Sequence, residues 1–178
     1  MKLWASRSTE TVFEVKPYLK VVREAVELPD GRRIDDFYQV QLRSFTSVVP
    51  VGSDGRITVL RHYKHGPRRI TLSFPGGFLE PDEAPLRGAQ RELAEETGVS
   101  GGCWTDLGTF TDNGNQRGCR GYYFLAQECE VTGVPDDGDL EEMEVLYMTV
   151  AEVDAAMRDG AFAIVHDVAN WGLARPYL

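Results

Sequence analysis

The sequence predicts an α+β fold built on a mixed β-sheet. Segments rich in β-branched and aromatic residues outnumber segments with helical spacing. The two kinds do not alternate strictly along the chain, as they would in a parallel doubly wound sheet. A chain of 178 residues without internal repeats or long linkers is expected to form one main domain with at most a small appended region.

The first 75 residues are expected to form strands that turn signals separate. The signal at residues 29–31 reads PDG, and the signal at residues 52–55 reads GSDG. Because β-rich sequence flanks residues 52–55 on both sides, we expect a hairpin there. The four expected strands are residues 19–28, 37–51, 56–63 and 70–74.

The pattern then changes to helical spacing over residues 85–97, and Gly98 supplies the stop that is common just past a helix end. Pro85 suits the first helical turn. The rest of the chain is expected to contain three strands and two closing helices, at residues 104–111, 121–131 and 143–149 and at about 151–158 and 162–174.

Composition excludes several classes of protein. The chain has 19 Lys and Arg against 28 Asp and Glu, a formal net charge of −9. This acidic balance argues against nucleic acid or an anionic membrane as a partner, because both require a basic face. No apolar run approaches the roughly 18 residues that a membrane span needs. Three cysteines without a C-x-x-C pair and an N-terminus without a secretory signal favour a cytoplasmic location.

Three carboxylates gather on one side of the expected helix at 85–97. At about 100° per residue, Glu92, Glu95 and Glu96 span an arc of only about 100°. Leu86 and Leu93 fall on the adjacent side, so both are expected to anchor the helix in the core.

Like charges at this spacing repel by a few tenths of a kcal/mol per pair, and a compensating charge is therefore expected. Arg91, four residues before Glu95, can supply part of it. A divalent cation would supply more, since clustered oxygen ligands suit Mg²⁺ or Mn²⁺. The more common alternative for such a pattern is a solvated acidic helix face.

The residues before the helix favour the metal site. At Gly76 and Gly77 a backbone carbonyl can approach a metal without a side chain in the way. Residues 77–99 read GFLEPDEAPLRGAQRELAEETGV. The segment matches the Nudix box at nine positions: Gly, five residues, Glu, seven residues, then Arg-Glu-apolar-x-Glu-Glu-x-Gly-apolar. The chain therefore resembles the Nudix hydrolases.

That resemblance implies an α/β/α sandwich and Mg²⁺-dependent hydrolysis of a nucleoside diphosphate linked to another moiety, with Mn²⁺ as a possible substitute. It assigns the metal to Glu92, Glu95 and Glu96, together with the Gly76 carbonyl. Glu92 and Glu95 also belong to the implied catalytic set, in which Arg91 orients Glu95. Glu83 is placed near a metal-bound water and the substrate.

Features outside the box resemble the branch that contains ADP-ribose and nucleotide-sugar pyrophosphatases. They are the LPDG turn at residues 28–31, the RHYK segment at 61–64 and the FPGGF segment at 74–78. In that branch the residue that matches Lys64 reaches a substrate phosphate. Lys64 and Arg61 are thus expected to bind substrate, the alternative being a solvated basic loop.

Two departures leave the substrate open. The branch usually has Glu where this chain has Ser73, and a proline that is often found about 16 residues beyond the box is missing. Hydrolysis of nucleoside triphosphates or dinucleoside polyphosphates is the alternative activity, and a non-catalytic nucleotide-sensing module is the rival from another class. Because all four box carboxylates are present, the enzyme is the favoured hypothesis.

The branch also places a catalytic base in a loop before the last strand. Here this loop is the acidic segment 136–144, in which Glu141 aligns best; an acidic surface loop is the alternative. Residues 1–45 are expected to form a β-strand region for dimerisation and substrate contact, and residues 46–178 the Nudix hydrolase domain. The expected partners are a small nucleotide substrate and a second copy of the chain.

Overall fold

The computed structural model describes residues 1–136 and 142–178. The chain divides into two compact units. The first comprises Met1–Ser44 and Phe110–Arg120, and the second comprises Phe45–Thr109 and Gly121–Leu178. Among the described residues, no helix combines the length and the apolar character needed to span a bilayer.

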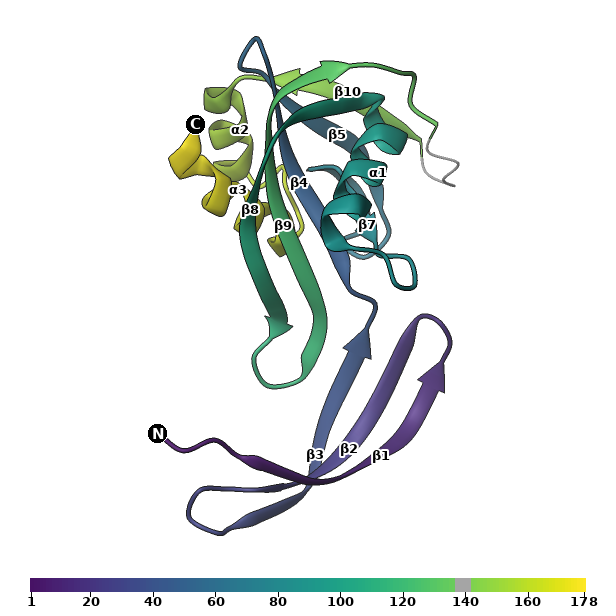
Figure 1. The fold of residues 1–178 in the computed structure, drawn as a ribbon, viewed down its shortest axis with the longest axis vertical. Coiled ribbons are helices and arrows are strands. Elements are labelled where there is room, and N and C mark those ends of the chain that lie inside the picture. The colour runs from purple at the N-terminus through teal and green to yellow at the C-terminus, as the bar shows by residue number, and fades with distance from the viewer. Residues whose placement is uncertain (137–141) are drawn as a thin grey trace. The chain divides into compact units, whose positions relative to one another are not determined.

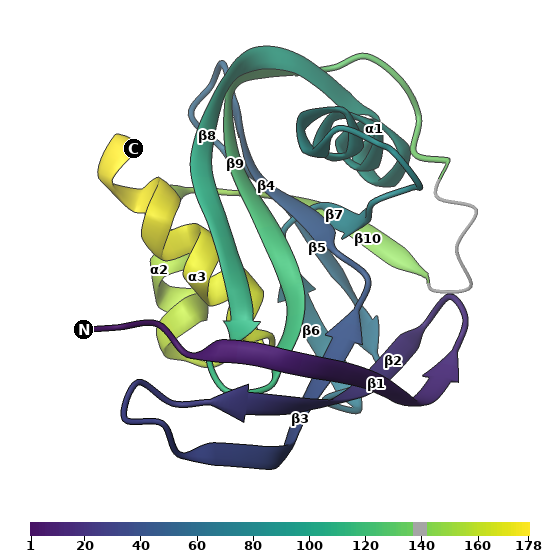
Figure 2. The same ribbon diagram turned by 60° about the horizontal axis from the view of Figure 1, so that its bottom comes forward.

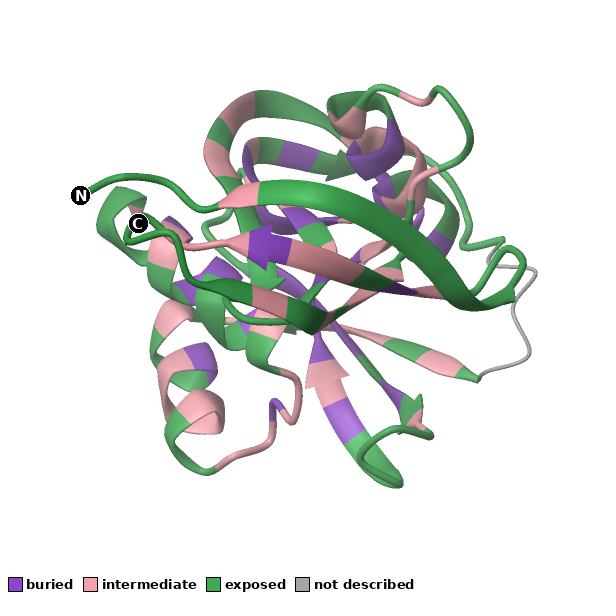
Figure 3. Ribbon diagram, turned by 90° about the horizontal axis from the view of Figure 1, so that it is seen from below, coloured by how far each residue is buried: buried purple, intermediate pink, exposed green. Residues whose placement is uncertain are grey.

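Three antiparallel strands form most of the first unit: β1 (Ala5–Val15), β2 (Leu19–Glu27) and β3 (Arg33–Leu42). They lie side by side in Figure 2. The sequence did not predict β1, which reads ASRSTETVFEV. Almost all of it is exposed (Figure 3), so it carries little of the alternation between apolar and polar residues that marks a half-buried strand.

The remaining strands are β4 (Phe45–Gly52), β5 (Ile57–Lys64), β6 (Arg69–Ser73), β7 (Gly76–Phe78), β8 (Val99–Asn113), β9 (Arg117–Val131) and β10 (Met143–Met148). The segment expected as one strand at 37–51 is divided between β3 and β4. The predicted hairpin is present, since Val51 pairs with Ile57 in antiparallel register. Strands β4 and β9 run parallel, while β5 pairs antiparallel with β6 and β10. The predicted mixed sheet is confirmed.

Helix α1 spans Pro85–Thr97, as the sequence predicts, and ends at Gly98 in the left-handed conformation (φ 68°). A glycine has no Cβ to oppose that conformation. The later helices are α2 (Val150–Arg158) and α3 (Val165–Ala174), followed by a short 3₁₀ helix at Arg175–Tyr177. Helix α3 begins three residues later than expected.

Both faces of the central strands in the second unit are buried. Adjacent residues Val48 and Val49 of β4 are each fully buried, but they belong to different core clusters. The Val48 cluster contains Leu93 of α1, and the Val49 cluster contains residues of α2 and α3. Successive strand residues point to opposite faces, so α1 covers one face and α2 and α3 cover the other (Figure 1). The predicted α/β/α sandwich is confirmed.

One core prediction is wrong. Leu93 is 0% exposed, but Leu86 is 39% exposed. The two residues share a face of α1, yet Leu86 lies about two turns nearer the N-terminus. Burial along the helix begins only at Gly88, so the first turn of α1 extends beyond the surface against which the rest of the helix packs.

Candidate active site

Strand β7 brings Gly76 and Gly77 close to side chains of α1. Gly77 pairs with Thr46 of β4, and Gly76 with Ser47. A Cβ on Gly77 would lie 2.5 Å from the carboxyl carbon of Glu92. The absence of a side chain therefore lets the Glu92 carboxylate lie against the backbone of β7.

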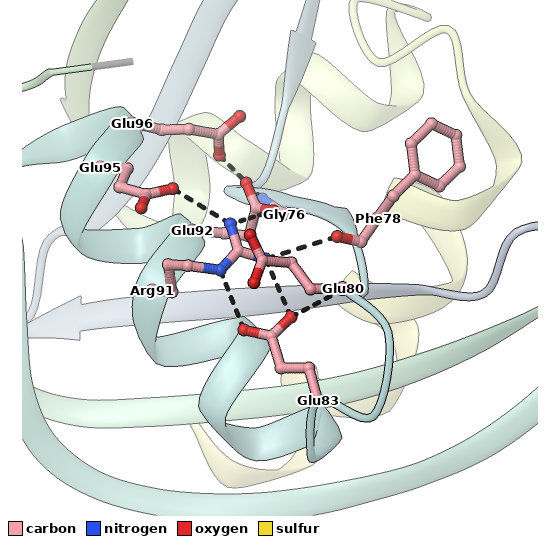
Figure 4. A network of polar contacts seen from close by, with 8 residues as sticks. All are labelled: Gly76, Phe78, Glu80, Glu83, Arg91, Glu92, Glu95 and Glu96. Carbon is pink, nitrogen blue, oxygen red and sulfur yellow. Dashed lines mark hydrogen bonds and ion pairs between the residues drawn. The ribbon is translucent and has the colours of Figure 1, made fainter. Parts of the chain in front are cut away.

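Arg91 is the centre of a carboxylate network (Figure 4). Its Nε donates to Glu83 Oε1 at 2.9 Å and its Nη2 to Glu83 Oε2 at 3.0 Å, a bidentate pair. Its Nη1 donates to Glu92 Oε1 at 2.8 Å and to Glu95 Oε2 at 3.0 Å. One guanidinium thus connects the loop before α1 to two carboxylates of the helix, and Arg91 reaches Glu95 as the resemblance implies.

These contacts shift the proton affinities at the site. The hydrogen bonds from Arg91, and then from the Glu80 amide, hold the pKa of Glu83 below its ordinary value. The hydrogen bond to Glu83 raises the pKa of Arg91 further above its already high value, with Glu92 and Glu95 acting in the same direction. Both side chains are therefore held in their charged forms.

Glu96 links the helix to β7. It is 8% exposed, and its Oε2 accepts a hydrogen bond from the Gly76 amide at 2.8 Å. The Glu96 carboxylate, which the resemblance assigns to a metal, is thus held beside Gly76, whose carbonyl the resemblance assigns to the same metal.

The donor chemistry of these residues fits a hard divalent cation. Every side chain that converges here, apart from Arg91, offers carboxylate oxygens (Figure 4). The four carboxylates of Glu83, Glu92, Glu95 and Glu96 exceed the charge of one guanidinium. Oxygen ligands with excess negative charge are those that Mg²⁺ and Mn²⁺ prefer.

Among the described residues, Arg61 of β5 and Arg69 of β6 contact different partners. Arg61 Nη1 donates to Glu144 Oε2 of β10 at 3.1 Å, and both side chains are more than half exposed. The Arg69 guanidinium donates to the Gly160 carbonyl. Lys64 lies at the end of β5, and its charge acts on Asp167 of α3.

The predicted base, Glu141, lies outside the described residues. The described residues on either side of residues 137–141 have backbone partners. On the N-terminal side the Asp136 amide donates to the Glu95 carbonyl at 2.8 Å. On the C-terminal side Met143 pairs with His62 of β5.

Ser73, which departs from the pattern of the branch, has a defined partner. Its Oγ lies 2.9 Å from His62 Nε2, and both residues are buried. Asp167 was not expected at the site, yet its carboxylate accepts the Phe74 amide at 2.9 Å. Nothing local in the sequence marks this contact, because 93 residues separate its partners.

The family assignment follows from comparison with known domains. Residues 41–168 match the NUDIX domain, and residues 4–40 match the nucleoside diphosphate sugar hydrolase N-terminal domain. The chain belongs to the Nudix family. The family predicted from residues 77–99 is therefore confirmed, and with it the prediction of a hydrolase of this family.

Relatives of this Nudix chain carry related names. It is 29% identical to an ADP-ribose pyrophosphatase of Bacillus subtilis (strain 168), over 72% of this chain and 70% of that protein. It is 31% identical to an ADP-sugar pyrophosphatase of Mus musculus over 58% of this chain, but it covers only 51% of that protein. A MutT-like protein of Streptomyces ambofaciens is 32% identical over 62% of this chain and 66% of its own length.

A solved structure shares the fold. The crystal structure of an ADP compounds hydrolase superposes with a TM-score of 0.82 and covers 100% of this chain and 95% of its own. At 21% identity, this likeness bears on the Nudix fold alone.

Proposed function

We propose that this Nudix protein hydrolyses the pyrophosphate bond of ADP-ribose or a related nucleoside diphosphate sugar, using Mg²⁺ or, in its place, Mn²⁺. The products would be a nucleoside monophosphate and a sugar phosphate. The observation that carries the proposal is the set of contacts that holds Glu96 against the Gly76 amide and Glu92 against Gly77, with Glu95 joined to Glu92 through Arg91. The match of residues 4–40 to the nucleoside diphosphate sugar hydrolase N-terminal domain supports the substrate class.

In this proposal Glu92, Glu95 and Glu96 hold the cation together with the Gly76 carbonyl. A bound divalent cation neutralises pyrophosphate oxygens and lowers the pKa of an attacking water. Arg91 keeps Glu95 in position while Glu83 holds Arg91 by its bidentate pair. A carboxylate set without a cation would repel the substrate.

Lys64 and Arg61 are proposed to bind the substrate phosphates. Arg61 would exchange its exposed contact with Glu144 for a phosphate oxygen, at little cost because exposed ion pairs contribute about 0–1 kcal/mol. Glu141 is proposed as the general base. The hydrogen bond from the Asp136 amide to the Glu95 backbone carbonyl supports this role, because it holds Asp136 at the last turn of α1.

A substrate panel tests the function. Purified protein is incubated with ADP-ribose, other nucleoside diphosphate sugars, nucleoside triphosphates and dinucleoside polyphosphates, with Mg²⁺ or with EDTA, and the products are identified by mass spectrometry. Glu95→Gln and Glu96→Gln are each expected to lower turnover by orders of magnitude, while Glu130→Gln, an exposed carboxylate of β9, keeps it. Near-normal activity in both active-site variants would refute the metal site.

The same panel judges the alternatives. Release of pyrophosphate from triphosphates without cleavage of nucleotide sugars would select the second activity. Binding of ADP-ribose without Mg²⁺-dependent turnover would select a sensing module. Retention of all four box carboxylates argues against that reading.

We propose further that two copies of the chain associate through residues 1–45. Strand β1 and its following turn expose large apolar side chains at Val12, Phe13, Val15 and Tyr18. Apolar residues gathered on a surface often mark a protein interface. Light scattering coupled to size exclusion should give twice the chain mass of 19.9 kDa. A Phe13→Glu, Tyr18→Glu double variant should give the monomer mass, and a monomeric parent protein would refute the dimer.

A further inference from the structure

The turn at residues 74–76 is held by carboxylates from two sides. The Phe74 amide donates to Asp167 Oδ1 of α3 at 2.9 Å, and the Gly76 amide donates to Glu96 Oε2 of α1 at 2.8 Å. Since α1 and α3 pack on opposite faces of the sheet, the two carboxylates fix the turn from opposite faces.

Pro75, between Phe74 and Gly76, also helps to fix the backbone of the turn. Pro75 has no amide hydrogen, so Phe74 and Gly76 carry both of the backbone donors in the turn, and both are bound by carboxylates. The Pro75 carbonyl accepts the Val48 amide of β4 at 3.0 Å. The Phe74 ring stacks on Trp171 of α3 at 5.9 Å. Three elements therefore determine the path of three consecutive residues.

Asp167 is an unusual residue for the core. It is 5% exposed, and burial raises its pKa to about 7, although the Phe74 amide and the Lys64 charge act in the opposite direction. A buried carboxyl costs free energy that an apolar residue would not. The carboxyl accepts a hydrogen bond from the Phe74 amide, so its structural role is to hold the turn at residues 74–76.

We propose that Asp167 is a positioning residue for the metal-binding turn, which it orients by accepting the Phe74 amide. This inference rests on the proposed function, because it concerns the direction of the Gly76 carbonyl. Asp167 acts through the backbone and touches neither cation nor substrate. Without this acceptor the turn can pivot about its remaining contacts, and loss of such an outer partner typically lowers metal affinity by about 10–100-fold.

The test is the affinity of the full chain for Mn²⁺ alone, measured by the electron paramagnetic resonance signal of free Mn²⁺. Asp167→Leu removes the acceptor and replaces a buried carboxyl, whose burial costs free energy, with an apolar side chain. It should weaken Mn²⁺ binding at least tenfold. Asp167→Asn retains an oxygen acceptor, so its Mn²⁺ affinity should stay within about threefold of the parent protein.

Asp154→Asn is the matched control. Asp154 of α2 accepts the Trp171 Nε1 proton at 2.8 Å, so it anchors α3 without touching the turn. Its substitution removes the charge that pairs with Arg175 at 3.2 Å, so it should lower the melting temperature and leave Mn²⁺ affinity unchanged. If Asp167→Leu does not fold, Asp167→Ala takes its place.

Two outcomes would overturn the inference while the proposed function stands: Mn²⁺ binding by Asp167→Leu as tight as that of the parent, or an equal loss in Asp154→Asn. If the parent binds no Mn²⁺, the proposed metal site fails. Amide hydrogen exchange at Phe74 and Gly76 in the metal-free protein then decides about Asp167 separately. Faster exchange in Asp167→Leu, but not in Asp154→Asn, supports positioning of the turn, and unchanged exchange refutes it.

Discussion

Replacement of Arg91 by Ala should show how much the carboxylate network contributes to stability when no metal is bound. The guanidinium side chain is 25% exposed, and its partners Glu83 and Glu92 are 13% and 14% exposed. Net contributions of hydrogen bonds to charged groups are about 1.5–3 kcal/mol when partners are this well buried. Glu95 is 48% exposed, so its contact contributes only about 0.5 kcal/mol.

Together these contacts predict that Arg91→Ala lowers the free energy of unfolding by about 4 kcal/mol. Glu83→Gln should cost about 2 kcal/mol because it weakens the bidentate pair, and Glu95→Gln less than about 1 kcal/mol. The order of these two losses follows from burial rather than from the spacing along the helix.

The assay is urea unfolding in EDTA, monitored by far-ultraviolet circular dichroism. An unchanged slope of the free energy of unfolding against urea concentration checks that unfolding stays two-state. Arg87→Ala on the same helix is the control. Arg87 contacts Gln90 at 3.3 Å in an exposed position, so its loss should change stability by less than about 0.5 kcal/mol. A cost below about 1 kcal/mol for Arg91→Ala, or a larger cost for Glu95→Gln than for Glu83→Gln, would refute the reasoning.

Two further predictions use the same protein. Gly77→Ala should lower kcat by about 10–100-fold with an unchanged fold, because its Cβ would displace the Glu92 carboxylate. Gly114→Ala is the control, since a Cβ at that position meets open space. Full activity of Gly77→Ala would contradict the geometry. Burial raises the pKa of Asp167 from 3.8 to about 7, so the folded protein binds a proton at Asp167 more tightly than the unfolded chain does. The contribution of this proton to the free energy of unfolding is fully present below about pH 4 and is lost as pH rises through about 7. Asp167→Asn should remove this loss in urea unfolding with EDTA, whereas parallel pH curves would refute it.

Helix α1 was predictable because its signals are local. Pro85 favours a first turn, Gly98 tolerates the left-handed conformation at the end, and the structure places the helix between them. The hairpin after β4 was predictable for the same reason. Strand β1 was not, because it depends on antiparallel pairing with β2, in which Glu10 lies opposite Arg23, and sequence spacing does not reveal a cross-strand partner.

The prediction for Leu86 failed for a different reason. Helical periodicity assigned it correctly to the side of Leu93, but periodicity carries no information on how far a helix extends beyond the sheet on which it packs. Burial of one residue and exposure of the other depend on where β4 and β7 lie along α1.

The sequence by itself determined the family, through the motif at residues 77–99. It also determined the carboxylate face, because the pitch of a helix places Glu92, Glu95 and Glu96 on one side of it. Only the tertiary structure decided which groups hold that face in place. Two contacts join segments that only packing brings together. One is the bidentate pair between Arg91 and Glu83, and the other is the hydrogen bond from the Phe74 amide to Asp167. Hydrogen bonds require a donor and an acceptor within about 3 Å in the correct direction, and no local sequence pattern specifies this relative position.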